Sequence, residues 1–419
     1  MNGDNPPSIR RVVPLPSSLK DRLRTWGPAR QAWTAIRARQ VEDEYRRRRD
    51  HYARLAEERG LVYSEARTTA EVRARLAARG YTPTRRARGE VHTFASIPIF
   101  GWHEHLVPDL GELGPLTHFD YTKLGFDLER FAAAEGEPTR RERARMNDML
   151  IDAVRAAHAV RPVDWIFLYG GGQDYSPSML RRLIDELGIP VVNMSLDDKQ
   201  GFVGHDVGDA RSGALDITRD TDLFMTSARS ACEWHLVEGG RPIYLPEGFN
   251  LAVYRPIDDL PRDIPMSFIG GAYGFRVAVV DAVRRAGIGI QPFGGGWGTR
   301  SVWRDEQVEI INRSVINLGM GGIEYSETFT NVKTRDFEIP GTGGGVYLTS
   351  FNADLAQHFV VGEEILCYQT HDELIDLARW YLTRPDVAHA IAQRARARSL
   401  REHRWLHRYE KLLSILGVL

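Results

Sequence analysis

Long apolar segments, clustered cysteines and a surplus of charge are all missing from this 419-residue sequence. No segment approaches the ~18 consecutive apolar residues that a membrane-spanning helix needs. The start of the chain also lacks the apolar core of ~7–15 residues that marks a secretory signal. We therefore expect a cytoplasmic protein. The 55 basic and 56 acidic side chains leave a formal net charge of -1, which argues against a dedicated nucleic-acid-binding protein.

Cysteine is scarce, because Cys232 and Cys367 are the only two and neither belongs to a C-x-x-C or Cys/His group. This excludes a disulfide framework and a structural zinc site. It predicts two reduced, buried thiols. The sequence also has no Walker loop, no G-x-S-x-G elbow and no Cys/His arrangement typical of a thiol nucleophile.

Lysine is scarce as well, since only five of the 55 basic residues are lysine. Residues 21–90 contain 18 arginines and no lysine against 10 acidic residues. The apolar spacing there predicts a long helix over 28–59 and a second helix over 69–79. We expect residues 1–90 to form a helical extension that either makes a homodimer or docks a substrate. Within it, Arg46–Arg49 either grips an anionic surface or belongs to a solvated helix face.

The composition, with 42% hydrophobic and 26% charged residues, is that of a globular protein with room for two domains. From residue 91, short apolar segments alternate with amphipathic helices, and the alternation restarts after a proline-containing connector near residue 250. This predicts an α/β fold with two Rossmann-like domains, 91–250 and 251–400, that face a cleft. The expected strands are His92–Ile97, Leu116–Phe119, Trp165–Tyr169, Val191–Met194 and Leu223–Thr226, then Met266–Ile269, Ile288–Pro292, Val315–Leu318, Gly345–Leu348 and Glu364–Cys367.

The first motif that suggests a binding site follows the strand expected to end at Ile269. Gly270, Gly271 and Gly274 would let backbone N–H groups approach an anion, and the next helix would add the partial positive charge of its N-terminus. Arg276 adds a fork of donors. A diphosphate suits this arrangement, and the alternative is an ordinary strand-to-helix turn with a surface arginine.

The second motif combines cations, a carboxylate and a glycine turn. Lys333 and Arg335 are suited to neutralise and hydrogen-bond a phosphate, and Glu338 is suited to accept from ribose hydroxyls. The glycines that follow would keep one wall of the site free of side chains. The residues of this wall are Gly341, Gly343, Gly344 and Gly345, and Thr342 between them is a further donor-binding candidate. The alternative is a glycine that caps a helix, with a surface ion pair nearby.

A third motif, the glycine run Gly170–Gly172, follows the strand Trp165–Tyr169. Acidic residues about 25 positions later make a nicotinamide-dinucleotide site a hypothesis, although Tyr175 stands where the third glycine of G-x-G-x-x-G belongs. The other hypothesis is that this loop lines the cleft. Asp197 and Asp198 then contact an acceptor or cap the next element.

The fourth motif is Trp102-His-Glu-His105, after the first expected strand. His103, Glu104 and His105 are candidates for acceptor binding or proton transfer. Asp120, after the second expected strand, is a further acceptor-binding candidate. The histidines do not form H-E-x-x-H and lack a third ligand, so a metal site is not expected, and structural hydrogen bonding is the alternative role.

The carboxyl-terminal half resembles a known family. The segments Lys333–Thr349 and Phe359–Tyr368, with the closing His403-Arg-Trp-Leu-His-Arg408, resemble the CgeB/YkvP-like branch of the glycosyltransferases. That branch is similar to the family-four glycosyltransferases of GT-B fold. The resemblance extends over roughly residue 164 to the end of the chain.

This resemblance implies a hexose-like sugar transferred from a nucleoside-diphosphate donor, held by the second domain, to a small-molecule, glycan or protein acceptor held by the first. It implies no metal and no other cofactor, retention at the sugar, and a final helix, 401–419, that crosses back to the first domain. From their own chemistry and place in the sequence, His103, Glu104, Lys333 and Arg335 are the candidate catalytic residues. Glu338 matches the second glutamate of the family's E-x7-E element, whereas Thr330 occupies the place of the first. A non-catalytic sugar- or nucleotide-binding protein and an NAD(P)-dependent oxidoreductase are the alternative functions.

Overall fold

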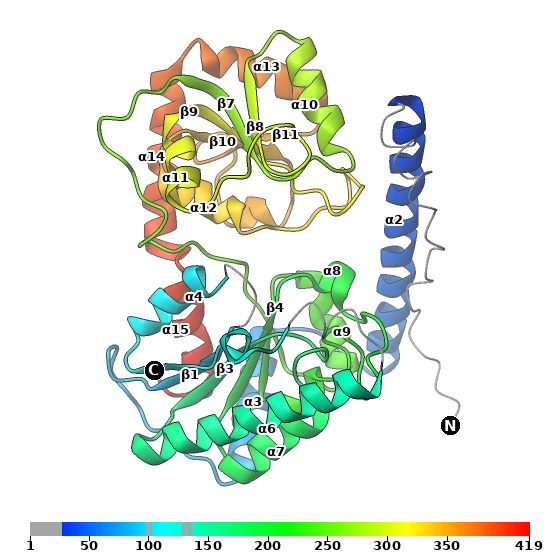
Figure 1. The fold of residues 1–419 in the computed structure, drawn as a ribbon, viewed down its shortest axis with the longest axis vertical. Helices are drawn as coiled ribbons and strands as arrows, with labels where there is room; N and C mark the ends of the chain where they lie inside the picture. The colour runs from blue at the N-terminus through cyan, green and yellow to red at the C-terminus, as the bar shows by residue number, and fades with distance from the viewer. Residues whose placement is uncertain (1–26, 98–101, 128–130, 132–135) are drawn as a thin grey trace. The chain divides into compact units, whose positions relative to one another are not determined.

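The computed structural model describes residues 27–97, 102–127, 131 and 136–419, which divide into two α/β units. Unit 1 contains described residues 44–246 and 405–419, and unit 2 contains residues 27–43 and 247–404. Each unit has one parallel sheet with helices on both faces (Figure 1). The predicted α/β class with two Rossmann-like sheets is therefore confirmed. The cleft between the domains stays a prediction.

The sheet of unit 1 has six parallel strands in the order β2-β1-β3-β4-β5-β6. Their bounds are β1 Thr93–Ser96, β2 Leu116–His118, β3 Trp165–Tyr169, β4 Val191–Ser195, β5 Leu223–Thr226 and β6 Pro242–Tyr244. Strands β1, β3 and β5 are buried along their whole length, as expected where helices cover both faces of a parallel sheet. The short strand β6 was not predicted.

Two layers of helices cover this sheet. Along β3, Ile166 and Leu168 belong to one core cluster, whereas Trp165 and Phe167 belong to the other, because successive side chains of a strand point to opposite faces. The helices and turns of unit 1 are the second half of α2 (Gly27–Glu58), α3 (Glu65–Ala78), α4 (Trp102–Gly111), η1 (Tyr121–Leu124), α6 (Glu137–Val160), α7 (Pro177–Leu187), α8 (Asp198–Gly201), η2 (Thr218–Asp220), η3 (Arg229–Ala231), α9 (Cys232–Val237) and α15 (Trp405–Leu416).

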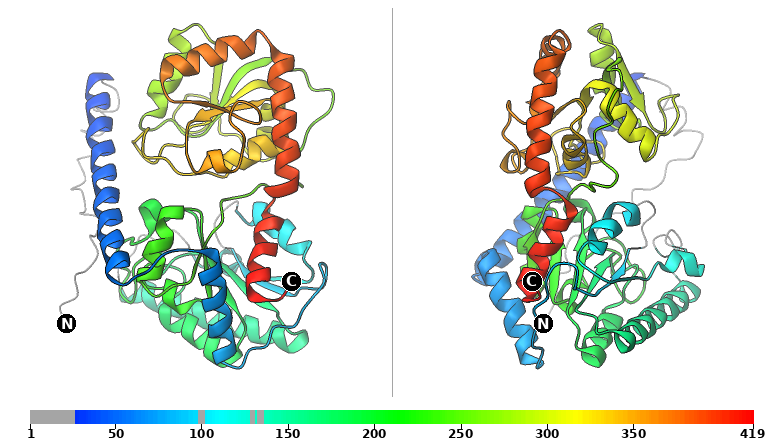
Figure 2. Two further views of the ribbon diagram at one scale, coloured as in Figure 1. Left: turned by 180° about the vertical axis from the view of Figure 1, so that it is seen from behind. Right: turned by 90° about the vertical axis from the view of Figure 1, so that its left-hand side faces the viewer.

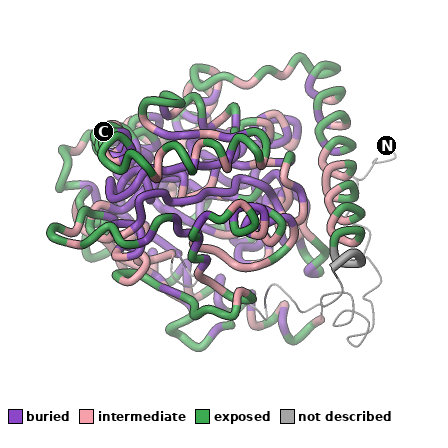
Figure 3. Tube along the Cα trace, turned by 90° about the horizontal axis from the view of Figure 1, so that it is seen from above, coloured by how far each residue is buried: buried purple, intermediate pink, exposed green. Residues whose placement is uncertain are grey.

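Unit 2 has five parallel strands in the order β11-β10-β9-β7-β8. They are β7 Ile264–Ile269, β8 Ile290–Phe293, β9 Ser314–Leu318, β10 Val346–Ser350 and β11 Leu366–Tyr368. The helices are α10 (Arg276–Arg285), α11 (Asp305–Arg313), α12 (Arg335–Thr342), η4 (Leu355–Gln357), α13 (His371–Leu382) and α14 (Pro385–Glu402). Figure 3 shows the buried positions concentrated on the strands and the exposed positions on the outer sides of the helices.

The arginine-rich amino-terminal segment is not separate from the first α/β unit. Tyr52 is fully buried, stacks on Trp234 with ring centroids 5.8 Å apart and donates to Glu238. In the Arg46–Arg49 run, Arg48 is buried and donates to the carbonyl oxygen of Lys199, whereas its three neighbours are exposed. Residues 44–90 therefore complete unit 1, and the dimerisation role stays a prediction.

The end of the chain also belongs to unit 1, which it enters at Trp405. Trp405 is fully buried, and the Leu406 N–H donates to Asp109 of α4. Helices α3 and α15 lie side by side on one face of the sheet (Figure 2, left), where Arg73 donates to the carbonyl oxygen of Ile415. Cys232 is buried and Cys367 is half-buried, and both are free thiols.

The two sheets share a strand order. Numbered from the start of each unit, the strands run 2-1-3-4-5, with a sixth strand added in unit 1. In this order the connections leave in opposite directions from neighbouring strands, and ligands bind outside the carboxyl ends of those strands. These switch points lie between β1 and β3 in unit 1 and between β7 and β9 in unit 2.

Candidate functional site

At the switch point of unit 2, the loop after β7 is held between two other loops. Gly270 donates to the carbonyl oxygen of Phe293, and Ala272 donates to that of Gly295, in the loop after β8. On the other side, Gly274 has a φ of +54°, and a Cβ there would lie 2.8 Å from the Glu324 oxygen in the loop after β9. The glycines thus allow three loops to meet at the carboxyl edge of the sheet.

Fewer backbone N–H groups of the loop after β7 are open to an anion than the sequence predicts. The Gly270 N–H is used by Phe293 and is not free for a ligand. The N–H groups of Gly271 and Gly274 donate to no protein group within the described part of the chain. Two backbone donors, not three, are therefore open to a ligand.

Arg276 is the first residue of α10 and only 7% exposed. Its guanidinium lies 4.2 Å from the centroid of the Tyr273 ring and 5.7 Å from that of Phe268. One long hydrogen bond joins Nη1 to the Gly271 oxygen at 3.5 Å, and the buried Nε has no partner among the described residues. Burial, followed by the positive charge of Arg335, lowers the pKa of Arg276 to about 10.

Arg335 brings a second cation to the same place. It is the first residue of α12, and its guanidinium also lies 5.7 Å from the Phe268 ring. Among the residues that the structure describes, no carboxylate lies within ion-pair distance of Arg276 or Arg335. Two like charges close together, one of them buried and at the positive ends of two helices, are costly without an anion. This cluster of Phe268, Arg276 and Arg335 is therefore built to receive negative charge.

Glu338 lies one turn after Arg335 on α12 and is also buried. The pKa of Tyr254 is raised well above its ordinary value, first by burial and then by the charge of Glu338 and a hydrogen bond to it. The Glu338 carboxylate is thus held by a neutral phenol beside the arginine pair. Lys333 is half-buried just before the helix, where its N–H donates to Asp336.

The structure does not bring the glycine turn to this edge. Residues 341–344 lie at the carboxyl end of α12, which leads into the amino end of β10. Gly343 has a φ of +72° and caps the helix, and a Cβ on Gly344 would lie 2.5 Å from the Asn312 Cα. Thr342 donates to the Glu338 carbonyl oxygen, and a Cβ on Gly341 would lie 2.5 Å from the Phe249 ring. All four residues therefore pack at the opposite edge from Arg276, and the capping-glycine alternative describes them.

Glu324 and Glu327, the glutamates nearest to Thr330, do not take the place of the first glutamate of the E-x7-E element. Thr330 bridges Gly322 at the base of the loop after β9. Glu327 lies 2.8 Å from Nε2 of His371, and Glu324 has a φ of +51° where the loop turns toward Gly274. Thr330 therefore holds the first E-x7-E position, and the structure places Glu324 and Glu327 elsewhere in the loop.

The structure brings some of the predicted acceptor residues of unit 1 close together. His103 and Glu104 lie in the first turn of α4, with Nε2 and Oε1 3.5 Å apart. The His103 ring stacks on His118, which sequence reasoning missed, at a centroid distance of 6.4 Å. Burial lowers the pKa of His118, an effect that Asp120 opposes and His103 reinforces. The ends of β1 and β2 thus bring His103, Glu104, His118 and Asp120 together.

The remaining acceptor candidates are placed differently. His105 packs against Trp102 with ring centroids 6.0 Å apart. Asp197 is exposed at the start of α8. Asp198 is buried and accepts from Ser195 and from Nε2 of His235, at 2.6 and 3.0 Å. Asp198 therefore has buried hydrogen-bond partners and no surface to offer an acceptor.

The glycine loop of unit 1 is covered by the chain itself. Cβ atoms on Gly171 and Gly172 would lie 2.1 Å from the backbone oxygens of Ser212 and Arg211. The Gly172 N–H donates to Gly213, and the Gly171 N–H donates to the buried carboxylate of Asp174. Backbone and carboxylate occupy the positions that a dinucleotide pyrophosphate needs, which argues against an oxidoreductase site here.

The described residues were also compared with what a metal site and a membrane span require. Within the described ranges, no three His, Cys, Asp or Glu side chains are placed so that they could hold a metal ion. Across those same residues, no helix is both long and apolar enough to cross a membrane.

Comparison with known proteins gives one family match. Residues 276–414, from the start of α10 into α15, match a family model described as glycosyl transferase-like. This range is less than half of the chain. No curated protein sequence matches.

Comparison with solved structures finds matches of low similarity. Sucrose-phosphate synthase from Thermosynechococcus elongatus is 15% identical with a TM-score of 0.47, over 84% of this chain and 92% of that one. HepE of Anabaena in complex with UDP and glucose is 11% identical with a TM-score of 0.47, over 85% and 96%. The UDP-forming α,α-trehalose-phosphate synthase from Burkholderia vietnamiensis is 12% identical with a TM-score of 0.47, over 78% and 100%. Identities this low carry no information about activity or ligands.

Proposed function

We propose that this protein is a glycosyltransferase that takes a sugar from a nucleoside-diphosphate donor bound at the carboxyl edge of unit 2. The observation that carries this proposal is the pair of guanidinium groups of Arg276 and Arg335 over one phenylalanine ring, with no carboxylate within ion-pair distance in the described structure. The match of residues 276–414 to a glycosyl transferase-like family supports it. The string Lys333–Thr349 supports a place in the CgeB/YkvP-like branch.

The chemistry follows from the leaving group. When the bond between the sugar and the diphosphate breaks, negative charge grows on the diphosphate, and fixed cations that meet this charge lower the barrier. Arg276 and Arg335 can donate in bidentate fashion, and the open N–H groups of Gly271 and Gly274 add to them. We assign Lys333 to the same task, which makes a metal unnecessary for this step.

Glu338 is assigned to the nucleoside. A buried carboxylate, held by Tyr254 and one helical turn from Arg335, can accept hydrogen bonds from the vicinal hydroxyls of a ribose. A hexose-like sugar and retention at its anomeric carbon follow from the resemblance of this segment to family-four enzymes. Nuclear magnetic resonance of the product anomer tests the retention.

The acceptor is assigned to unit 1. His103 and Glu104 are partly exposed and lie beside His118 and Asp120. A histidine next to a carboxylate can take the proton of an attacking hydroxyl. The acceptor is a hydroxyl-bearing small molecule, glycan or protein.

The test is a screen of UDP, GDP, dTDP, ADP and CMP sugars by thermal shift, with NAD and NADP included. A ligand at about 100 times its dissociation constant stabilises the folded state by ~2.7 kcal/mol. We expect one nucleoside-diphosphate sugar to raise the melting temperature and Glu338→Ala to reduce that rise. Slow release of the nucleoside diphosphate during incubation separates an enzyme from a binding protein of the same fold.

Two outcomes would contradict the proposal. A shift with NAD or NADP alone favours an oxidoreductase, and binding of a nucleotide sugar without turnover in the presence of any acceptor pool favours a binding protein. Glu309→Ala, on the exposed side of α11, is the matched control for Glu338→Ala and is expected to leave the shift unchanged.

A further inference from the structure

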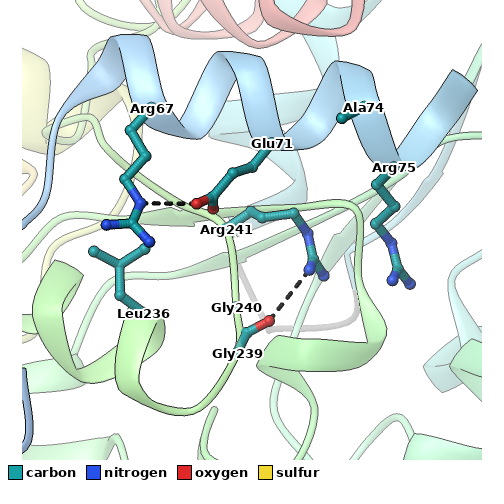
Figure 4. Close-up of a pocket in the computed structure, with 8 residues that line it drawn as sticks. All are labelled: Arg67, Glu71, Ala74, Arg75, Leu236, Gly239, Gly240 and Arg241. Atoms are coloured by element: carbon teal, nitrogen blue, oxygen red, sulfur yellow. Dashed lines mark hydrogen bonds and ion pairs between the residues drawn. The ribbon is translucent and has the colours of Figure 1, made fainter. Parts of the chain in front are cut away.

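A second positively charged site lies in unit 1, between α3 and the segment that leads into β6. Its cavity has a volume of about 390 Å³, and its lining includes Arg67, Glu71, Arg75, Gly239, Gly240 and Arg241 (Figure 4). Arg241 directly precedes β6, so the cavity is at the amino edge of the sheet. His103 and Asp120 are at the carboxyl edge, and the cavity is therefore separate from the acceptor position.

The helical spacing of α3 explains how the arginines reach this cavity. Arg67, Glu71 and Arg75 follow one another at intervals of four residues and share one face of the helix. The adjoining stripe of Thr68, Val72 and Leu76 is buried. Helix α3 thus has one charged face, which carries some of the amino-terminal arginines, beside one buried face.

Arg241 forms the fixed wall of the cavity. Its guanidinium donates to the carbonyl oxygens of Asp222, Gly239 and Arg219 at 2.9, 3.2 and 2.8 Å, and also to that of Thr221. Burial, followed by the positive charge of Arg75, lowers the pKa of Arg241 to about 10. A rigid cation is therefore held next to another cation, an arrangement that a bound anion would stabilise.

The two arginines of α3 have donors to spare. Arg67 uses Nε for Glu71 at 2.7 Å, and Arg75 uses Nε for Asp222 at 3.0 Å. Their Nη1 and Nη2 atoms donate to no group among the residues that the structure describes. Asp222 is shared with Arg79, and Glu71 and Asp220 are the other carboxylates that act on Arg241. Three carboxylates therefore face the four arginines 67, 75, 79 and 241.

We propose that this cavity binds a small phosphate-bearing anion between Arg67, Arg75 and Arg241. The forked guanidinium groups match the geometry of phosphate oxygens. A phosphate carries up to two negative charges and several acceptor oxygens, which suits the surplus of cations better than a carboxylate does. The volume is at the lower end of the range for small-molecule sites, enough for a phosphate with a sugar-sized substituent.

The test is isothermal titration of the full-length protein with inorganic phosphate, at fixed ionic strength against a chloride reference. Arg67→Gln and Arg75→Gln are each expected to weaken binding about tenfold, because each removes a charge-assisted hydrogen bond. Glu71→Gln is expected to tighten binding severalfold, since Glu71 competes with the anion for Arg67. A loss of structure could not produce this gain.

Control variants locate the site. Arg284→Gln, an exposed arginine of α10, is expected to leave phosphate affinity unchanged. The titrations are repeated in an Arg276→Ala background, so that phosphate bound at the proposed donor site does not contribute to the measured heat. Equal affinity in the Arg67, Arg75 and Glu71 variants, or no heat beyond that of chloride, would overturn the proposal.

Competition then distinguishes two sources of the phosphate group. A hexose phosphate that displaces inorganic phosphate, and loses affinity in Arg75→Gln, identifies a phosphorylated metabolite as the occupant. Failure of the hexose phosphate to compete while inorganic phosphate still binds identifies the free ion. Both results support the site, whether or not the transferase assignment holds.

Discussion

Units 1 and 2 have the same strand order, yet the glycine loops at their switch points are filled differently. In unit 1, the loop after β3 is covered by the backbone of residues 211–213, and its N–H groups donate to Gly213 and Asp174. In unit 2, the loop after β7 keeps two open N–H groups and faces the arginines 276 and 335. The shared topology positions both loops, and the side chains and neighbouring loops decide which one can bind an anion.

The largest effect is expected from a methyl group added to the covered loop. Gly171→Ala places a Cβ 2.1 Å from the Ser212 backbone oxygen, and we expect a loss of about 3 kcal/mol in the free energy of unfolding. Gly295→Ala, where nothing lies within 4 Å, is the control and should change stability by less than about 0.5 kcal/mol. Urea denaturation measures both, and equal stability of the two variants would mean that the unit 1 loop is open.

The buried carboxylate of the covered loop gives a pH dependence. Burial raises the pKa of Asp174 from 3.8 to about 6, although Tyr121 and Gly171 donate to it. A raised folded-state pKa stabilises the protein at low pH, and this contribution is lost as the pH rises from about 4 to about 6. Over this pH window, the free energy of unfolding of the wild type should fall by about 2–3 kcal/mol relative to that of Asp174→Asn. Parallel curves of stability against pH would contradict the burial of this charge.

The open loop is tested through ligand affinity. Arg276→Ala is expected to weaken nucleoside-diphosphate binding about 30-fold, or ~2 kcal/mol, because it removes hydrogen bonds to a charged group. Arg284→Ala, on the exposed end of the same helix, is the matched control. A loss that appears equally in both variants would indicate a general charge effect and not a site.

The smallest effect concerns stability without ligand. Arg276→Met replaces a cation that has no carboxylate partner in the described structure with an apolar side chain of similar length. We expect the free energy of unfolding to rise by about 1 kcal/mol while binding is lost. Chemical denaturation of the ligand-free protein measures the change. A fall in stability would mean that the stacking of Arg276 on Tyr273 outweighs the repulsion from Arg335.

Much of the fold could be predicted from local patterns. The predicted strands Trp165–Tyr169 and Leu223–Thr226 have the observed bounds, because a buried parallel strand is a short apolar run between turn residues. Strand β6 was missed because it has three residues and begins with a proline. The amino-terminal helices were read as an extension, since helical spacing does not reveal that Tyr52 packs on Trp234.

The candidate site could be predicted only in part. Glycines and arginines after a strand indicated the region of Arg276, and a basic pair before a helix indicated Arg335. Both guanidinium groups lie over Phe268 because of the order of the strands in the sheet. The spacing of the motifs along the sequence does not predict that order. The Gly341–Gly344 segment was misplaced, because a glycine run reads the same whether it opens a site or caps a helix. His118 was missed because a lone histidine in a short strand carries no motif.

The most direct test of the difference between the units is hydrogen exchange of the full-length protein with and without the nucleoside diphosphate that gives the largest thermal shift. We expect the ligand to slow exchange in residues 270–276 and 335–342 and to leave residues 170–176 unchanged. Protection confined to residues 170–176 would contradict it, because the ligand would then occupy the loop that the structure shows to be filled by the chain itself.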